Sequence, residues 1–256
     1  MKHIVDFKVL KNIPLPDSDF ELLVQSETNL ETILPGQFVN ILITNTDKTL
    51  LRRPISICDV DYEQRSLLFY VRKVGQGTQK LSELKIGDTI NMIYPLGNGF
   101  SLKAKKPLLI GGGCGIAPLL FLSKQYESKG IKPTILLGGK AEKSLSLRQK
   151  FSQQLSIFTT TDDGSCGEKG LVTSHSVMKE LNQFDIIQTC GPQIMMQAVA
   201  KLAENAHVKC EVSLENTMAC GVGACLCCVT KTTHGNECVC TKGPIFDSKE
   251  LINFVK

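Results

Sequence analysis

Apolar and polar positions alternate in short segments along the first part of the chain. Strand-like segments occupy positions 38–44, 66–71 and 89–93. Turn-forming pairs such as Pro35-Gly36 and Gly87-Asp88 separate them. Several short strands at this spacing are typical of a small antiparallel β-barrel. The pattern also predicts one short helix, which begins near Thr78 with that residue as its N-cap.

After residue 100 the pattern changes. Apolar strand-like runs at 106–110, 133–137 and 184–189 alternate with helical periods at 118–128 and 193–205. Strands that alternate with helices predict a parallel sheet built from βαβ units. We therefore expect an antiparallel β-barrel at 1–100, a parallel-sheet α/β domain at 101–210 and a small C-terminal module at 211–256, which shows little periodicity.

Length and charge narrow the class of protein. A chain of 256 residues buries a substantial core, and a net charge of +4 is too small for the concentrated basic face of a nucleic-acid binder. The N-terminus has no continuous apolar region of the signal-peptide type, and glycines interrupt the most apolar run, 107–122. We therefore expect a soluble cytoplasmic protein without a nucleic-acid or membrane partner.

Cysteines gather near the end of the chain, where seven of the 11 lie between positions 210 and 240. Such clustering favours metal ligation over a disulfide framework. Three of them follow one another at x4 and x2 spacing and a fourth comes later, which is the spacing of plant-type [2Fe-2S] ligation. The predicted iron ligands are Cys220, Cys225, Cys228 and Cys240.

A zinc site is the alternative for these cysteines. Four thiolates from Cys225, Cys228, Cys238 and Cys240 can form a tetrahedral site. Zinc ribbons usually contain two C-x2-C pairs, whereas this chain has one, so the iron–sulfur interpretation is favoured.

Three further motifs are suited to binding phosphate groups. The glycine turn at 111–118 lies where a strand meets a helix, which is the position of a dinucleotide pyrophosphate, and Pro118 suits the first helical turn. The double arginine at 52–53 offers charge-assisted bonds to phosphate. Gly75, Gly77 and Thr78 precede or begin the short helix and can direct N–H groups at a second phosphate. Asp162 and Asp163, by contrast, are expected in a surface turn.

Taken in this order, the motifs resemble those of the ferredoxin–NADP reductase superfamily, in which a flavin-binding barrel precedes a nicotinamide domain. With the cysteine cluster added, the whole chain is similar to the electron-transfer subunits of dihydroorotate dehydrogenase B. The resemblance rests on R-R-P-I-S-I at 52–57, T-D-D-G-S at 161–165, M-A-C-G-V-G-A-C at 218–225 and G-P-I-F at 243–246.

This resemblance implies a role for each motif. FAD is expected to contact Arg53, Pro54, Ile55, Ser56, Tyr70, Val71 and Arg72, with phosphate at Gly75, Gly77 and Thr78. The nicotinamide nucleotide is expected at Gly111, Gly112, Gly113 and Gly115 and at Cys190, Gly191 and Pro192. The C-terminal module is expected to hold the [2Fe-2S] cluster.

Two cysteines depart from the family pattern. Cys227 stands where glycine is usual, and Cys238 lies two residues before the expected fourth ligand. We favour Cys240 as that ligand because T-K-G-P-I-F follows it, as in the family ending C-x-x-G-P-V-F. Ligand exchange with Cys227 or Cys238 remains open.

The implied chemistry needs no acid or base from the protein, so no catalytic residue is expected. The resemblance implies that electrons pass from an FMN-containing catalytic partner subunit, in a 2+2 heterotetramer, through the cluster and FAD to NAD+ as substrate, in pyrimidine biosynthesis. Lys140 and Lys143 follow the second strand of the α/β domain, where they can meet the 2′-phosphate of NADP. The alternatives are the small subunit of an NADH-dependent ferredoxin:NADP oxidoreductase or related hydrogenase, and a non-enzymatic redox-sensing or zinc-binding module.

Overall fold

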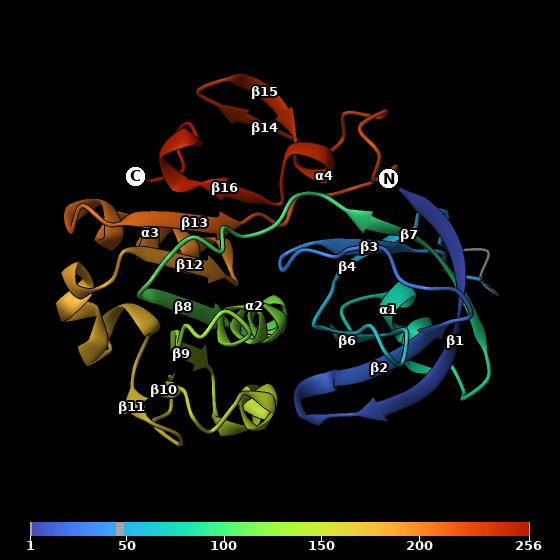
Figure 1. Cartoon of the computed structure of the whole chain (residues 1–256), viewed down its shortest axis with the longest axis horizontal. Coiled ribbons are helices and arrows are strands. Elements are labelled where there is room, and N and C mark those ends of the chain that lie inside the picture. Colours follow the sequence, from blue (N-terminus) through green and yellow to red (C-terminus); the bar gives the residue numbers. More distant parts are fainter. Residues whose placement is uncertain (1, 45–48, 256) are drawn as a thin grey trace.

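The N-terminal part of the protein, up to Leu96, forms one curled antiparallel sheet. We describe residues 2–44 and 49–255 of a computed structural model, in which this sheet has seven strands in the order β4-β3-β7-β1-β2-β6-β5 (Figure 1). The strands are β1 (His3–Pro14), β2 (Asp19–Ser26), β3 (Phe38–Ile41), β4 (Arg53–Ser56), β5 (Asp59–Asp61), β6 (Ser66–Arg72) and β7 (Thr89–Leu96). Residues 57–58 connect β4 at one edge of the sheet directly to β5 at the other. The chain therefore curls the sheet into the expected barrel-like form.

Alternation of side chains explains why these segments form a half-buried sheet. Along β2, Phe20, Leu22 and Val24 are buried, and the alternating residues Glu21 and Leu23 are only partly covered. The inward side chains join Val39 and Ile41 of β3 in one apolar core inside the curled sheet. Burial of each such side chain stabilises the fold by roughly 1.5–3 kcal/mol.

The short helix differs from the sequence prediction at its start. Helix α1 spans Gln76–Ser82, and its N-cap is Gly75 rather than Thr78. Thr78 lies inside the first turn, where its hydroxyl accepts hydrogen bonds from the backbone N–H groups of Val74 at 2.9 Å and Gly75 at 3.3 Å. The threonine thus caps the helix from the third helical position, because the side chain reaches back to the free N–H groups.

The second sheet forms the α/β domain and is parallel except at one edge. Its strands are β8 (Pro107–Gly112), β9 (Thr134–Gly139), β10 (Ser156–Thr161), β11 (Glu168–Lys169), β12 (Ile186–Cys190), β13 (Lys209–Ser213) and β16 (Ile245–Asp247). They lie in the order β11-β10-β9-β8-β12-β13-β16, and β16 alone runs antiparallel to its neighbour. The chain turns to opposite sides of β8 for β9 and β12, so a topological switch point lies at β8.

Helices α2 (Ala117–Glu127) and α3 (Gln193–Asn205) pack on this sheet and confirm the two predicted helices (Figure 1). Pro118 stands in the first turn of α2, as expected. Among the described residues, no helix combines the length and the apolar character needed to cross a membrane. The 3₁₀ segments are η1 (Pro16–Ser18), η2 (Gly113–Ile116), η3 (Glu142–Lys150), η4 (Val172–Ser174), η5 (Ser176–Gln183) and η6 (Ser248–Glu250).

The cysteine-rich C-terminal segment is more regular than its sequence suggests. It contains the hairpin β14 (Val229–Thr232) and β15 (Gly235–Cys238), the short helix α4 (Val239–Lys242), and β16. Each has only three or four residues, which is too short for a periodic pattern to emerge. Most of its buried apolar side chains belong to the same apolar core as Phe38 and Leu96 of the barrel and Leu108 of the α/β sheet.

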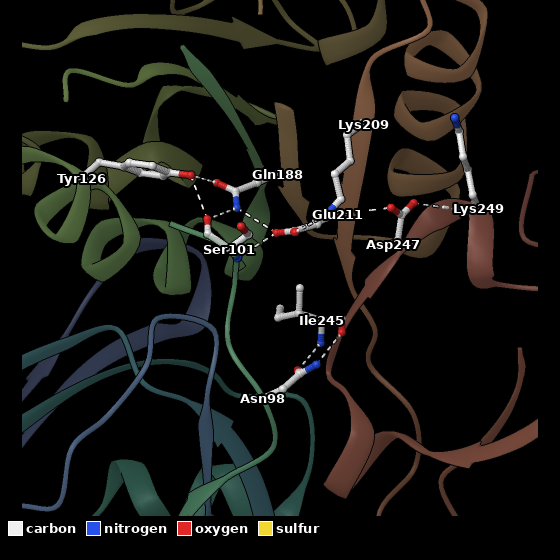
Figure 2. A network of polar contacts seen from close by, with 9 residues as sticks. All are labelled: Asn98, Ser101, Tyr126, Gln188, Lys209, Glu211, Ile245, Asp247 and Lys249. Atoms are coloured by element: carbon white, nitrogen blue, oxygen red, sulfur yellow. Dashed lines mark hydrogen bonds and ion pairs between the residues drawn. The ribbon is translucent and has the colours of Figure 1, made fainter. Parts of the chain in front are cut away.

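Asn98, in the linker between the two sheets, holds this segment in place (Figure 2). Its side-chain amide donates to the carbonyl oxygens of Lys242 at 2.7 Å and Ile245 at 2.8 Å, and its Oδ1 accepts from the Ile245 N–H at 2.9 Å. The Asn98 N–H also donates to the carbonyl of Gly243 at 2.6 Å. Gly97 has φ +75° and allows this approach, since a Cβ there would lie 2.5 Å from the Gly243 oxygen.

A second set of polar contacts joins the same linker to the α/β sheet. Glu211 of β13 accepts hydrogen bonds from the Ser101 N–H at 3.0 Å and from the Gln188 side chain at 2.8 Å (Figure 2). The hydroxyl of Tyr126, at the end of α2, donates to the Ser101 carbonyl at 2.8 Å. These buried polar groups satisfy one another, so the linker is fixed on both sides.

We predict that Asn98→Ala destabilises the protein by about 1–3 kcal/mol, because it removes three side-chain hydrogen bonds to backbone groups. Denaturant unfolding followed by circular dichroism measures the change. Asn236→Ala, at an exposed position of β15, is the matched control and should leave the free energy of unfolding within about 0.5 kcal/mol. Equal stability of the two variants would contradict the role given to Asn98.

Candidate redox site

A pocket of about 330 Å³ lies where the barrel, the α/β domain and the C-terminal segment meet. The barrel lines it with Arg53, Pro54, Ile55, Ser56, Tyr70, Val71, Arg72 and Thr78. The α/β domain adds Cys114 and Cys190, and the C-terminal segment adds Asn216, Met218 and Pro244. Most residues predicted to contact FAD therefore surround one cavity, together with residues near the cysteine cluster that the sequence analysis did not assign to the flavin.

Buried Asp19 fixes two of the predicted flavin-contacting residues. The guanidinium of Arg72 donates to Asp19 through Nε at 2.7 Å and Nη2 at 2.9 Å, and the hydroxyl of Tyr70 donates to the same carboxylate. The hydrogen bond to Asp19 is the main reason that the pKa of Arg72 is raised. Burial, followed by the Asp19 hydrogen bond, raises the pKa of Tyr70. Arg72 stays charged and Tyr70 stays protonated at neutral pH.

The Arg53 side chain lies against Gly77 at the start of helix α1. Gly77 is buried, and a Cβ atom on it would lie 2.6 Å from Arg53 Nε. Gly75 is exposed at the N-cap, with no atom within 4 Å of a Cβ placed there. Only Gly77 is thus needed for the Arg53 side chain to lie across the start of α1, and neither glycine lines the pocket itself.

A larger pocket of about 800 Å³ lies at the carboxyl ends of β8, β9 and β10. Gly112, Gly113 and Pro192 line it, as predicted for a nicotinamide nucleotide, and Arg72 lines both pockets. Ligands of parallel α/β sheets bind in this position, at the carboxyl ends of the strands beside the switch point.

The remaining glycines predicted to contact the nucleotide do not line this pocket, but lie behind the residues that do. Gly115 packs against the backbone of Cys190, which leaves no room for a side chain. Gly191 has φ +153°, and a Cβ on it would meet the backbone of Gly112 at 2.9 Å. Gly111 faces Leu119 and Ile116 of the following helical turn. These residues bring the two strand ends close together, while burial raises the pKa of the Cys190 thiol to about 12.

Charged side chains at the larger pocket include two that the sequence analysis did not assign to it. Asp17 from the barrel pairs with Lys143 at 2.8 Å and accepts from the Ser144 hydroxyl at 2.6 Å. These contacts, with the Lys143 hydrogen bond first, hold the pKa of Asp17 below its usual value. Asp162 is exposed, as expected for a surface turn, and lines the pocket together with Lys140. The pairing of Asp17 with Lys143 arises from residues far apart in sequence, so no local pattern revealed it.

Backbone N–H groups surround the first predicted cluster ligand. The Cys220 sulfur accepts hydrogen bonds from the N–H groups of Val222 and Cys225, each at 3.4 Å. Burial alone raises the pKa of Cys220, but these backbone donors outweigh it and lower the pKa to about 6. The loop therefore stabilises a thiolate, which is the form that binds iron.

The other three predicted ligands differ in exposure. Cys228 and Cys240 are buried, and the Cys240 N–H donates to the Cys228 sulfur at 3.4 Å. The backbone of Gly223, in the loop between Cys220 and Cys225, lowers the pKa of the Cys240 thiol, but this effect is smaller than that of burial. Burial and a hydrogen bond with Cys228 raise the pKa of Cys240 to about 12 in the metal-free thiol form. Cys225 is exposed at the end of the loop.

The two additional cysteines occupy different environments. Cys227 is exposed, whereas Cys238 is half-buried and its thiol contacts that of Cys228. Burial, followed by the neighbouring Cys228, raises the pKa of Cys238. Within residues 2–44 and 49–255, no three His, Cys, Asp or Glu side chains are arranged to hold a single metal ion. The thiols and the N–H donors aimed at their sulfurs form a donor set of the kind that suits iron–sulfur chemistry.

Two protein-family models match the chain, one over the predicted nucleotide-binding segment and one over the cysteine-rich segment. Residues 109–201 match the oxidoreductase NAD-binding domain. Residues 215–252 match the iron–sulfur cluster binding domain of dihydroorotate dehydrogenase B. Together with the curled sheet, these matches define a reductase of the ferredoxin–NADP reductase type that carries an additional iron–sulfur domain.

Curated relatives narrow this class further. The chain is 36% identical over 251 residues to the dihydroorotate dehydrogenase B (NAD+) electron transfer subunit of Geobacillus sp. strain WCH70, covering 95% of this chain and 96% of the relative. The corresponding protein of Clostridium acetobutylicum is 39% identical over 248 residues, covering 96% of each chain. The protein belongs to the family of dihydroorotate dehydrogenase B (NAD+) electron transfer subunits.

Solved structures agree on the fold. A chain of the NADH-dependent reduced ferredoxin–NADP oxidoreductase matches with a TM-score of 0.85 and 31% identity, covering 96% of this chain and 89% of that one. Phthalate dioxygenase reductase matches with a TM-score of 0.67 at 14% identity, covering 90% of this chain and 87% of that one. The expected fold class of barrel, α/β domain and iron–sulfur module is confirmed.

We predict that Gly77→Ala weakens FAD binding about tenfold, because the new methyl group displaces the Arg53 side chain. Flavin fluorescence during titration of the flavin-free protein measures the dissociation constant. Gly75→Ala is the matched control, since its methyl group meets open space, and it should bind FAD as the wild type does. Unchanged affinity in Gly77→Ala would show that Arg53 does not hold the flavin.

Proposed function

We propose that the protein is the electron-transfer subunit of a dihydroorotate dehydrogenase B, which passes electrons from a catalytic partner through a [2Fe-2S] cluster and FAD to NAD+. One observation supports this most strongly. The 330 Å³ pocket is lined at once by the predicted flavin residues, by Cys190 beside the nucleotide turn, and by Met218 from the segment that carries the cysteines. A molecule in this pocket contacts all three units.

The role of each group follows from the number of electrons that it transfers at a time. NAD+ accepts two electrons as a hydride and a [2Fe-2S] cluster carries one at a time, whereas FAD exchanges electrons in either way. The protein's own residues need only bind, orient and exclude water. Arg53 offers its charge to the FAD pyrophosphate and Ser56 faces the ring, as the family pattern implies. Arg72, held by Asp19, provides a fixed positive charge between the two pockets.

For the cluster we propose ligation by Cys220, Cys225, Cys228 and Cys240. Support for Cys240 over Cys238 comes from its surroundings. Cys240 is buried, and its N–H donates to the sulfur of the proposed ligand Cys228 at 3.4 Å. Cys238 contacts Cys228 from the end of β15. Cys227 is an exposed thiol. Both additional cysteines are then free thiols beside a complete set of ligands.

We further propose a preference for NAD over NADP. Lys143 is already paired with Asp17 at 2.8 Å, so its charge is partly neutralised. Asp162 lines the same pocket and would repel a 2′-phosphate while it can accept hydrogen bonds from ribose hydroxyls. Lys140 also lines this pocket and is the positive charge that remains to attract a 2′-phosphate.

The oxidation of dihydroorotate belongs, in this proposal, to a separate FMN-containing subunit in a 2+2 heterotetramer. In this proposal the units 1–100, 101–210 and 211–256 of this chain bind FAD, the nicotinamide nucleotide and the cluster, respectively. A cytoplasmic location suits both free thiols and a pyrimidine-biosynthetic role.

We predict that the purified chain reduces ferricyanide with NADH, but forms no orotate from dihydroorotate. NADPH should be slower than NADH by at least about tenfold, because Asp162 repels the additional phosphate. Absorbance assays of each reaction give these rates. Orotate formation by the isolated chain would contradict the proposal. Co-purification with a larger iron–sulfur flavoprotein would instead favour the NADH-dependent ferredoxin:NADP oxidoreductase alternative.

A further inference from the structure

A buried amide in the barrel has no partner within the chain. Asn40 of β3 is 0% exposed, and among residues 2–44 and 49–255 neither its Nδ2 nor its Oδ1 finds a hydrogen-bond partner. It is the one described side chain in which both polar atoms are left in this way. Burial of an unsatisfied amide costs roughly 1–3 kcal/mol, and native proteins rarely retain one without a reason.

The strand directs this side chain away from the barrel core. Val39 and Ile41 point into that core, so Phe38 and Asn40 lie on the opposite face of β3. Phe38 lines the flavin pocket, and Pro54, which pairs with Asn40 across β3 and β4, lines it as well. Asn40 thus lies directly beside the proposed flavin site, on the face that carries the C-terminal segment.

The same amide reaches the loop of the proposed cluster ligands. A Cβ atom on Gly221 would lie 2.8 Å from Asn40 Nδ2, so the amide packs against the residue that follows Cys220. Gly221 is buried with φ +71° and has no side chain to cover the amide. The Cys220 sulfur already accepts N–H groups of Val222 and Cys225 from its own loop. Asn40 brings a further N–H donor to this region from the barrel.

We propose that Asn40 donates a hydrogen bond from Nδ2 to a sulfide of the cluster beside Gly221. This inference rests on the proposed function, since it requires the cluster. Reduction adds one electron, and therefore negative charge, to the iron–sulfur unit. A donor to sulfur stabilises the reduced form more than the oxidised form, so it raises the reduction potential. The barrel that binds flavin would in this way also tune the potential of the group next to it.

The test is an EPR-monitored redox titration of the purified, cluster-loaded protein. Asn40→Leu keeps the size of the side chain but removes the donor. It should lower the equilibrium constant for one-electron reduction roughly tenfold, which corresponds to a potential about 59 mV more negative. Ile41→Val is the matched control, because Ile41 faces the barrel core. The cluster of this variant should have the same reduction potential as the cluster of the wild type.

Each outcome decides a different question. If Asn40→Leu assembles no cluster, Asn40→Ala replaces it, with the same expected direction of change. A potential that is unchanged in whichever variant assembles overturns the role of Asn40, since the amide is then satisfied by a buried water. A wild-type protein without an iron–sulfur EPR signal after reduction with dithionite contradicts the proposed function itself, so the two failures are distinguishable.

Discussion

The structure depends on how the linker residue Asn98 holds the cysteine-rich segment. Interfaces between domains of one chain usually permit relative motion, yet electron transfer needs its partners at a fixed short separation. Asn98 forms four hydrogen bonds to positions 242–245, and Gly97 lets the two backbones meet. Strand β16 then continues into the α/β sheet beside β13. The segment proposed to bind the cluster is thereby fixed against both other units.

A second constraint, at Arg72, joins the two pockets proposed for flavin and nucleotide. Its guanidinium lines both pockets and is held at 2.7 Å by the buried carboxylate of Asp19. The same carboxylate accepts from Tyr70, so one acidic group orients two residues of the wall. Chemistry that the cofactors perform themselves requires little else from the protein than such fixed positions. For this reason no catalytic acid or base is expected among the residues of the proposed site.

Local patterns in the sequence predicted most of the fold, whereas contacts between distant residues could not be read from it. Helix α3 was expected at the residues where it occurs, because its apolar period and flanking turn are local signals. The cysteine spacing likewise matched a family model. Thr78 was misplaced as an N-cap because a hydroxyl can serve from either of two positions. Asp17 with Lys143, and Asn40 with Gly221, are separated by long stretches of chain and meet only through the fold.

The central claim is that flavin and cluster lie in electronic contact within one chain. Anaerobic addition of NADH to the purified protein, followed by optical and EPR spectroscopy, tests it most directly. The account predicts that the flavin absorbance bleaches and that a signal of a reduced [2Fe-2S] cluster appears in the same protein. A flavin that bleaches while the cluster stays oxidised, at a potential that NADH can reach, would contradict the proposed path of electrons.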